Sequence, residues 1–311
     1  MSLLEVKHLR VAFHRDGKEI VPVRDVSFTV PEHGRVALVG ESGCGKSLTA
    51  LSLARLSPTD RASLSGEILL DGKPADATSV RRIAYVFQNP TDSLNPVMRI
   101  SDQIREALPK GMDKAAQMAR VIELLTRTGL PDPQRAAHAY PCELSGGQQQ
   151  RCMIAMALAA QPDLLVADEP TTALDVTTQK QVLELIDSLA AETGMAVLLI
   201  THNLGLVAGR MDEVNVMYAG RIVESGPVLE VLSAPRHPYT KGLLAAVPAL
   251  DAPRDAPLAD IPGTVPPPDA WPSGCAFWPR CASKQERCSK EQPAEIVAGA
   301  RRCACWCVEN V

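Results

Sequence analysis

The run of residues 40–47, Gly-Glu-Ser-Gly-Cys-Gly-Lys-Ser, constrains this chain more than any other feature. It follows the apolar residues 35–39, which predict a strand, and it opens onto residues 48–53, which can form a helix. Glycines let the backbone curl so that successive N–H groups face one anion, and the N-terminus of a helix adds partial positive charge. A strand, a glycine loop and a helix in this order predict a Walker A loop that binds nucleotide phosphates.

The residues expected to surround the phosphates form one continuous stretch: Gly40, Glu41, Ser42, Gly43, Cys44, Gly45, Lys46, Ser47 and Leu48. Lys46 would reach the β- and γ-phosphates, and the hydroxyl of Ser47 would ligate Mg²⁺. The alternative is a glycine-rich turn that binds nothing, and the flanking strand and helix argue against it.

The second half of a phosphate site follows the apolar run of residues 164–167, at Asp168 and Glu169. A buried parallel strand is typically a continuous apolar stretch, and ligands gather beyond the carboxyl ends of such strands. Asp168 is therefore placed to hold the Mg²⁺ shell, and Glu169 to orient or deprotonate the attacking water. Alone, this pair would indicate a solvated strand end. Together with the glycine loop it predicts a Walker B motif.

Between these two motifs, Leu144 is followed by a second small nest at the start of a helix-forming run: Ser145, Gly146, Gly147 and Gln148. Two glycines after a serine at a helix start can bind an anion. Because the chain already supplies its own phosphate loop, this nest is most useful to a nucleotide held by another subunit.

In this order the motifs resemble those of ATP-binding-cassette (ABC) ATPases, whose signature is Leu-Ser-Gly-Gly-Gln. The resemblance implies that ATP is the nucleotide and that Gln88 is the Q-loop glutamine, which senses the metal. It also implies that Asp175 lies in the D-loop and that His202 is the switch histidine. Phe13 would stack on adenine, a contact worth roughly 1–3 kcal/mol. The expected catalytic residues are Glu169, His202, Lys46 and Gln88, and the expected Mg²⁺ ligands are Ser47, Gln88 and Asp168.

Two residues depart from the family pattern. Leu48 stands where many relatives carry a hydroxyl for the α-phosphate, although its backbone N–H can still serve. Asn203 replaces the commoner Asp after the switch histidine, which leaves the imidazole itself in place. We therefore expect an active ATPase.

The expected fold class is α/β. It comprises a P-loop NTPase (RecA-like) core, an antiparallel β subdomain from strands such as 19–23, 26–30 and 66–71, and a small Cys-rich C-terminal extension. A helical subdomain is expected at about 89–160, where apolar residues recur at helix spacing. The core resumes with a strand at 164–167, a helix at 178–192 and a strand at 196–200. The predicted ABC domain is 1–250, and residues 251–311 form a Pro-rich linker and the Cys-rich extension.

The composition predicts a protein without a membrane span of its own. The formal net charge is -4, which gives no global attraction to nucleic acid or anionic lipid. No apolar stretch approaches the roughly 20 residues that cross a bilayer, and residues 1–7 lack the features of a signal peptide. We expect a cytosolic chain that meets a membrane through its partners.

The last quarter of the chain narrows the resemblance. Residues 237–244, His-Pro-Tyr-Thr-Lys-Gly-Leu-Leu, and residues 88–96 are similar to segments of oligopeptide, dipeptide and nickel importer ATPases. This implies a head-to-tail dimer with a second, identical or homologous ATPase subunit, two transmembrane permease subunits, and an extracytoplasmic solute-binding protein that acts indirectly. The implied location is peripheral, on the cytoplasmic side of the cell membrane. Nucleic acid is not an expected partner.

Six of the nine cysteines lie after the Pro-rich stretch: Cys275, Cys281, Cys288, Cys303, Cys305 and Cys307. In a cytosolic protein, clustered cysteines favour metal ligation over disulfides, but this spacing matches neither a zinc ribbon nor a ferredoxin. The family resemblance implies a [4Fe-4S] cluster on Cys275, Cys281, Cys288 and Cys305, with Cys303 and Cys307 as competitors for the fourth position. Zinc and metal-free thiols remain the alternatives.

Two function classes follow. The favoured one is the ATP-hydrolysing subunit of an importer for peptides or a related small solute such as nickel. The alternative is a soluble ABC ATPase that acts in translation or DNA repair. Such proteins usually carry two cassettes or a long coiled coil, and this chain has one Walker A loop and no sustained heptads.

Overall fold

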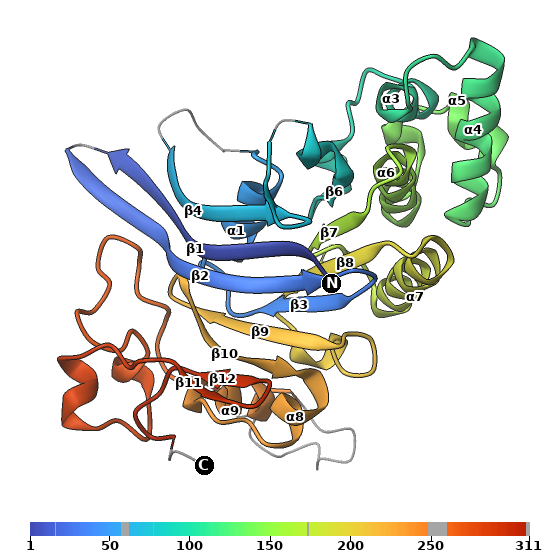
Figure 1. The fold of residues 1–311 in the computed structure, drawn as a ribbon. Coiled ribbons are helices and arrows are strands. Elements are labelled where there is room, and N and C mark those ends of the chain that lie inside the picture. Colours follow the sequence, from blue (N-terminus) through green and yellow to red (C-terminus); the bar gives the residue numbers. More distant parts are fainter. Residues whose placement is uncertain (16, 57–61, 77, 173, 248–259, 309–311) are drawn as a thin grey trace. The chain divides into compact units, whose positions relative to one another are not determined.

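The computed structural model describes residues 1–15, 17–56, 62–76, 78–172, 174–247 and 260–308. The chain divides into two compact units, Met1–Pro74 with Leu199–Val311 and Ala75–Leu198 (Figure 1). The domain boundary expected near residue 250 lies outside the described residues, so that division remains a prediction. Within the described ranges, none of the helices combines the length and the apolar composition that a bilayer crossing requires.

The first unit is built on β strands. They are β1 (Ser2–Arg15), β2 (Lys18–Pro31), β3 (Arg35–Val39), β4 (Ala62–Leu70), β5 (Lys73–Pro74), β9 (Glu213–Tyr218), β10 (Arg221–Pro227), β11 (Ile296–Ala298) and β12 (Arg301–Cys303). In this unit the strand order is β5-β4-β1-β2-β10-β9-β3, and β12 also pairs with β10. The helices are α1 (Lys46–Leu53), α8 (Val228–Ser233) and α9 (Pro238–Ala245), with 3-10 turns η3 (Leu204–Leu206), η4 (Trp278–Arg280) and η5 (Glu286–Ser289).

The antiparallel strands of this unit are longer than predicted. The two short strands expected at 19–23 and 26–30 form one strand, β2, which pairs with β1 through several register shifts (Figure 1). Irregular register lets one long strand bend while it keeps its apolar residues on the buried face. At the turn between β4 and β5, Asp71 and Gly72 both adopt positive φ, as a two-residue hairpin turn requires.

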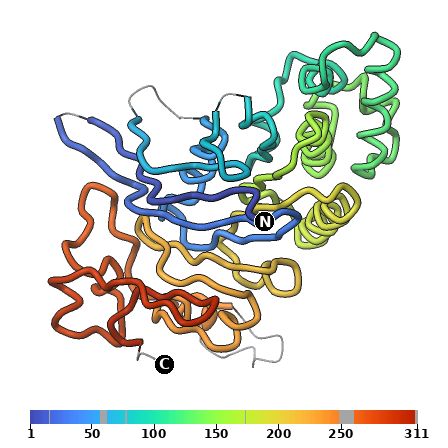
Figure 2. The backbone as a smooth tube through the Cα atoms, viewed as in Figure 1, coloured from blue at the N-terminus to red at the C-terminus, as the bar shows by residue number. Residues whose placement is uncertain are grey.

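The C-terminal extension belongs to the first unit. Figure 2 shows its described part, residues 260–308, folded beside the strand β10. The contact is a strand pairing, because Glu224 and Ser225 of β10 pair antiparallel with Cys303 and Arg302 of β12.

The second unit is mainly helical. It contains β6 (Ile83–Val86) and β7 (Leu164–Asp168), which pair in parallel, and the 3-10 turns η1 (Ser79–Arg82) and η2 (Pro141–Glu143). Its helices are α2 (Pro90–Ser93), α3 (Ile100–Ala107), α4 (Lys114–Arg127), α5 (Pro133–His138), α6 (Gly146–Ala159) and α7 (Val176–Thr193). The boundary between the units falls inside β8 (Ala196–Thr201).

Helix α4 illustrates why these residues form helices. Asp113 caps it by accepting a hydrogen bond from the N–H of Ala116, and Val121, Leu124 and Leu125 are buried on one face. Helices α3 to α6 pack on one another through such faces (Figure 1). Gly194 ends α7 in the left-handed conformation, which glycine adopts without steric cost. The predicted α/β P-loop fold class is confirmed.

Candidate nucleotide site

The Walker A loop joins β3 to α1, and its glycines have steric reasons to be glycine. Gly43 and Gly45 adopt positive φ, 80° and 104°, which other residues rarely do. A Cβ atom on Gly40 would lie 2.2 Å from the backbone oxygen of Met217, so β9 approaches the loop too closely for a side chain. Glycine loops of this shape, placed before a helix, bind phosphate oxygens through backbone N–H groups.

Lys46 is buried at the start of this helix. Its Nζ donates hydrogen bonds of 2.7 Å to the carbonyl oxygen of Gly40 and 3.0 Å to that of Glu41. These bonds hold the ammonium group across the loop. A phosphate bound in the loop would lie beside this positive charge. Ser47, the predicted Mg²⁺ ligand, is the next residue of α1.

The Walker B residues lie at the end of β7 in the second unit: Asp168 is the last residue of the strand, and Glu169 follows it. Asp168 is buried, and its Oδ2 accepts a hydrogen bond of 2.7 Å from the hydroxyl of Tyr85 on β6. Burial, with a further contribution from the Asp168 carboxylate, raises the pKa of Tyr85 well above its ordinary value. Tyr85 therefore remains a hydrogen-bond donor and fixes one oxygen of the carboxylate.

Glu169 and Gln88, which the sequence predicts as catalytic residues, lie close together. Gln88 Nε2 is 3.4 Å from Glu169 Oε2, which also accepts a hydrogen bond of 2.9 Å from the hydroxyl of Thr172. Glu169 has a positive φ of 44°, an uncommon conformation for a non-glycine residue. Strain of this kind often accompanies functional side chains.

The signature residues form the N-terminus of α6. Ser145 caps the helix and accepts a hydrogen bond from the N–H of Gln148, whose side chain accepts one from the N–H of Ser145. Gly146 and Gly147 form the first turn, and Ser145 and Gly146 are exposed. An exposed, capped helix start with small residues can bind an anion presented from outside the chain.

The remaining predicted residues lie at or near the start of a helix or the end of a strand. Asp175 caps α7 through the N–H groups of Thr177 and Thr178, and the hydrogen bond from the Thr178 hydroxyl lowers its pKa. His202 follows β8 and is exposed. The unusual Asn203 accepts a hydrogen bond of 2.8 Å from the N–H of Gly205 and so caps η3.

Phe13, the predicted adenine platform, lies on β1 opposite Ile20 of β2 and Ala62 of β4. It is half-buried there. Phe13, Lys46, Ser47 and His202 belong to the first unit, whereas Gln88, the signature, the Walker B residues and Asp175 belong to the second.

Comparison with protein families decides the identity. Residues 23–172 match the family described as ABC transporter, and residues 223–288 match the family described as oligopeptide/dipeptide transporter, C-terminal region. The chain is 46% identical over 313 residues to a protein of Brucella abortus named as a peptide import ATP-binding protein, covering 97% of this chain and 94% of the relative. The chain belongs to the ABC transporter family.

Other relatives agree with this assignment. A protein of Brucella ovis, also named as a peptide import ATP-binding protein, is 50% identical over 312 residues, covering 94% of this chain and 92% of that one. Among solved structures, the ATP-binding cassette MJ0796 in a dimeric post-hydrolysis state, bound to ADP and phosphate, has a TM-score of 0.63 and 26% identity. The match covers 72% of this chain and 98% of the MJ0796 chain. CbiO1 of Clostridium perfringens, part of an ABC transporter complex, has a TM-score of 0.64 and 25% identity, covering 75% of this chain and 91% of its own.

The structure adds residues to this ABC ATPase site that sequence reasoning missed. Arg280 of the C-terminal extension donates from Nη1 to both carboxylate oxygens of Glu41, at 3.1 and 3.0 Å, and the Tyr239 hydroxyl accepts a hydrogen bond of 2.8 Å from the Glu41 N–H. Arg280 and Tyr239 therefore fix the second residue of the Walker A loop. The segment that contains Tyr239 supported the family resemblance, but nothing in the sequence connected Tyr239 or Arg280 with Glu41.

Gln149 is a second such residue, next to the signature. Its buried amide donates to the carbonyl oxygens of Pro141 and Leu144, at 2.8 and 3.1 Å, and accepts a hydrogen bond from the Thr91 hydroxyl. These bonds hold the loop that leads into the signature. The only local signal was the Gln-Gln-Gln run at residues 148–150.

The predicted iron–sulfur ligands are not assembled in this structure. Among the described residues, no three His, Cys, Asp or Glu side chains are placed to hold a metal ion. Cys288 Sγ accepts the N–H of Gln285, and Cys305 Sγ accepts the N–H of Cys307. Burial raises the pKa of Cys275 and, to about 12, that of Cys305.

Proposed function

We propose that this chain hydrolyses ATP to drive the import of oligopeptides or dipeptides through a membrane permease. One observation carries the proposal: a complete set of ABC motifs is joined to a C-terminal region of the oligopeptide/dipeptide transporter type. The relatives named as peptide import proteins extend over both parts. Nickel is a further candidate solute, because residues 88–96 and 237–244 of this chain also resemble segments of nickel importer ATPases.

The donor chemistry fits Mg²⁺ and a nucleotide. The Ser47 hydroxyl, the Asp168 carboxylate and the Gln88 amide supply the hard oxygen ligands that Mg²⁺ prefers. These three residues would hold the ion, which would supply positive charge to neutralise the phosphates. The loop N–H groups and Lys46 would bind the same phosphates, and Tyr85 would keep the Asp168 carboxylate in one orientation.

Glu169 is the proposed general base. Its carboxylate would orient the attacking water and take its proton, and the hydrogen bond from Thr172 holds one of the carboxylate oxygens. Gln88 contacts the same carboxylate and would report the state of the site to a permease. His202 would stabilise charge on the phosphate that leaves.

The proposed assembly is a head-to-tail dimer of cassettes. The exposed Ser145 and Gly146 would bind a nucleotide held by the Walker loops of a second subunit, identical or homologous. Two permease subunits would complete the transporter, with a solute-binding protein outside, and the chain would lie at the cytoplasmic face of the membrane. ATP would close the dimer and hydrolysis would reopen it, since a ligand shifts an equilibrium by its difference in affinity for the two states.

Two variants test the catalytic part. Lys46→Ala should abolish productive ATP use, and Glu169→Gln should bind ATP but accumulate as an ATP-bound dimer, measured by light scattering with Mg-ATP. Glu184→Gln, on the exposed side of α7, is the matched control. Parental turnover by Glu169→Gln would show that its assigned role is wrong.

Affinity purification from membranes tests the transport part. Recovery of two multispanning permease subunits supports the importer. Recovery of ribosomes or DNA would instead favour an ABC ATPase that acts in translation or DNA repair.

The [4Fe-4S] cluster on the C-terminal cysteines stays a prediction, and no step of the proposed ATP hydrolysis depends on it. Iron, sulfide and zinc analysis of anaerobically purified protein separates the three possibilities for the cysteine-rich segment. About four irons and four sulfides per chain would show that the cysteines rearrange around a cluster. Zinc alone, or no metal, would exclude it.

A further inference from the structure

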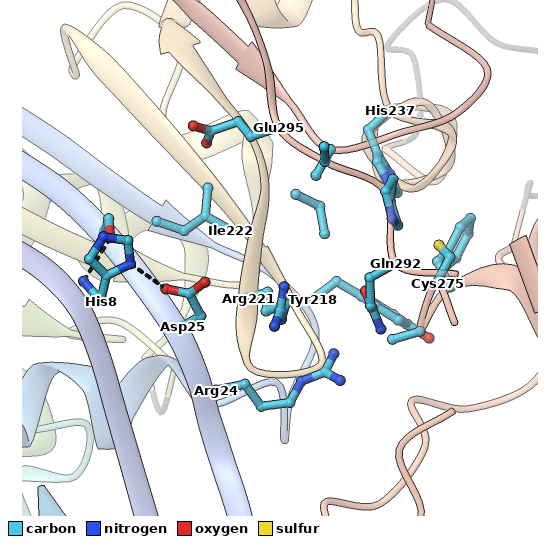
Figure 3. Close-up of a pocket in the computed structure, with 17 residues that line it drawn as sticks. His8, Arg24, Asp25, Tyr218, Arg221, Ile222, His237, Cys275, Gln292 and Glu295 are labelled. Atoms are coloured by element: carbon cyan, nitrogen blue, oxygen red, sulfur yellow. Dashed lines mark hydrogen bonds and ion pairs between the residues drawn. The ribbon is translucent and has the colours of Figure 1, made fainter. Parts of the chain in front are cut away.

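A cavity of about 340 Å³ lies in the first unit, away from the Walker A loop (Figure 3). Its walls come from β2, β10 and the C-terminal segment that follows Cys275. The charged residues in the walls are Arg24, Asp25, Arg221 and Glu295, together with His8. This volume lies within the range of small-molecule sites.

The two carboxylates in the walls have basic partners of their own. Asp25 Oδ1 is 3.0 Å from Nδ1 of His8, a pair that Figure 3 shows as a dashed line. Glu295 pairs with Arg302 at 3.8 Å. Neither carboxylate lies within ion-pair distance of Arg24 or Arg221.

Among the described residues, neither arginine of the cavity forms an ion pair within 4.0 Å, although Asp269 lines an adjoining pocket with both of them. Arg24 uses Nε to donate to the carbonyl oxygen of Ala219, and its guanidinium lies 5.1 Å from the ring centroid of Trp271. Nε of Arg221 is buried and has no described hydrogen-bond partner. Burial, and then the positive charge of Arg221, lowers the pKa of Arg24 to about 10. Both guanidinium groups therefore belong to the lining of the same cavity.

Two partly desolvated guanidinium groups in the lining of one cavity cost free energy unless an anion joins them. The planar guanidinium group presents parallel N–H donors that match the oxygens of carboxylate and phosphate groups. The indole of Trp271 and the Ala219 carbonyl hold Arg24 in place, which lowers the entropy cost of binding. We propose that Arg24 and Arg221 bind the carboxylate or phosphate group of a small molecule in this cavity.

Isothermal titration calorimetry on the full chain tests this site. The protein is first saturated with Mg-ADP, so that phosphate cannot enter the Walker A loop. It is then titrated separately with potassium phosphate, citrate and trialanine, and with potassium chloride at equal ionic strength. We expect saturable 1:1 binding of at least one of the three probes and none of chloride. Phosphate binding alone indicates a phosphorylated ligand, and binding of citrate or trialanine indicates a carboxylate.

Substitutions link the binding to the two arginines. Arg221→Gln and, independently, Arg24→Gln should each weaken binding of the active probe at least tenfold. Arg81→Gln, an exposed arginine outside the cavity, should leave it unchanged. Thermal unfolding of each variant establishes that it is folded. If one variant does not fold, the variant of the other arginine carries the test.

The proposal is overturned if no probe binds saturably, or if folded variants of both arginines bind as the parent does. The ADP step keeps this result separate from the proposed function. If ADP binds and the probes do not, only the oxyanion site fails, whereas failure of ADP to bind contradicts the nucleotide site itself.

Discussion

The hydroxyl of Tyr85 on β6 donates a hydrogen bond of 2.7 Å to Oδ2 of Asp168, the Walker B carboxylate at the end of β7. Two neighbouring parallel strands thus supply the carboxylate proposed as an Mg²⁺ ligand and the hydroxyl that orients it. Outer partners of this kind commonly change metal affinity by 10–100-fold when removed.

Tyr85→Phe removes only this hydroxyl. We expect kcat/KM for ATP to fall about tenfold, because a hydrogen bond to a charged group contributes about 1.5–3 kcal/mol. The Mg²⁺ concentration at half-maximal activity should rise as well. Tyr140→Phe, at a half-exposed tyrosine of the same unit, is the control for the loss of a hydroxyl. An unchanged Mg²⁺ dependence in Tyr85→Phe would contradict the orienting role.

Arg280→Met should weaken nucleotide binding from outside the Walker A loop. The substitution leaves Glu41 without its ion-pair partner, and because Arg280 is buried we expect a loss of about 2 kcal/mol in the free energy of unfolding. ADP affinity should fall with it. Lys290→Met, at an exposed ion pair of the same segment, should change neither quantity. The double variant Arg280→Met with Glu41→Gln should recover part of the stability, and no recovery would mean that the pair itself is unimportant.

Gln149→Leu should uncouple ATP binding from turnover. Without the amide, the carbonyl oxygens of Pro141 and Leu144 lose their donors, and the loop before the signature loosens at a cost of about 1–3 kcal/mol. The signature is proposed to act on the nucleotide of a partner subunit, so kcat should fall while the ADP dissociation constant of the single chain stays constant. Gln117→Leu removes a similar bond, to Met112, away from the signature. A parallel rise in the ADP dissociation constant would contradict this division of roles.

His237 makes stability depend on pH. Burial lowers its pKa from 6.5 to about 3, and its Nδ1 accepts the N–H of Tyr239 as a neutral ring. The charged groups on the elements around it, Glu224 and Arg301, are paired with each other at 2.7 Å. Below pH 6.5 only the unfolded chain takes up this proton, so the stabilisation present above pH 6.5 is lost as the pH falls towards 3.

At pH 5 the loss at this residue is about 2 kcal/mol. Urea unfolding at pH 7 and pH 5 should show that His237→Asn, which keeps a helix-capping acceptor, loses less stability than the parent over this interval. His14→Asn, at an exposed histidine, should behave as the parent does. Equal losses in the parent and His237→Asn would assign the pH dependence to other groups.

Features encoded in neighbouring residues were predictable from the sequence. The strand, glycine loop and helix around Lys46 follow from local composition, and so do the apolar strand before Asp168 and the helix end at Gly194. Each depends on residues a few positions apart, where periodicity and turn chemistry act directly.

Contacts between distant segments were not predictable in this way. Arg280 and Glu41 are separated by 239 positions, and Tyr85 and Asp168 by 83. No period or spacing connects such residues, because their proximity depends on strand order and on how the chain folds back. The cysteine-rich segment shows the same limit. From spacing alone, Cys303, Cys305 and Cys307 compete for the fourth ligand position of a cluster. The structure places Cys303 on β12, in register with Glu224.

The pairing of β12 with β10 also bears on how the protein can be shortened. Near Arg221 the strand β10 pairs with β2, but at Glu224 and Ser225 its neighbour is β12. A chain cut after α9 would leave those backbone groups as an open sheet edge. It would also remove Arg301, the ion-pair partner of the Glu224 carboxylate. Such a truncated ATPase should self-associate and precipitate, so biochemical work on the cassette requires the whole polypeptide.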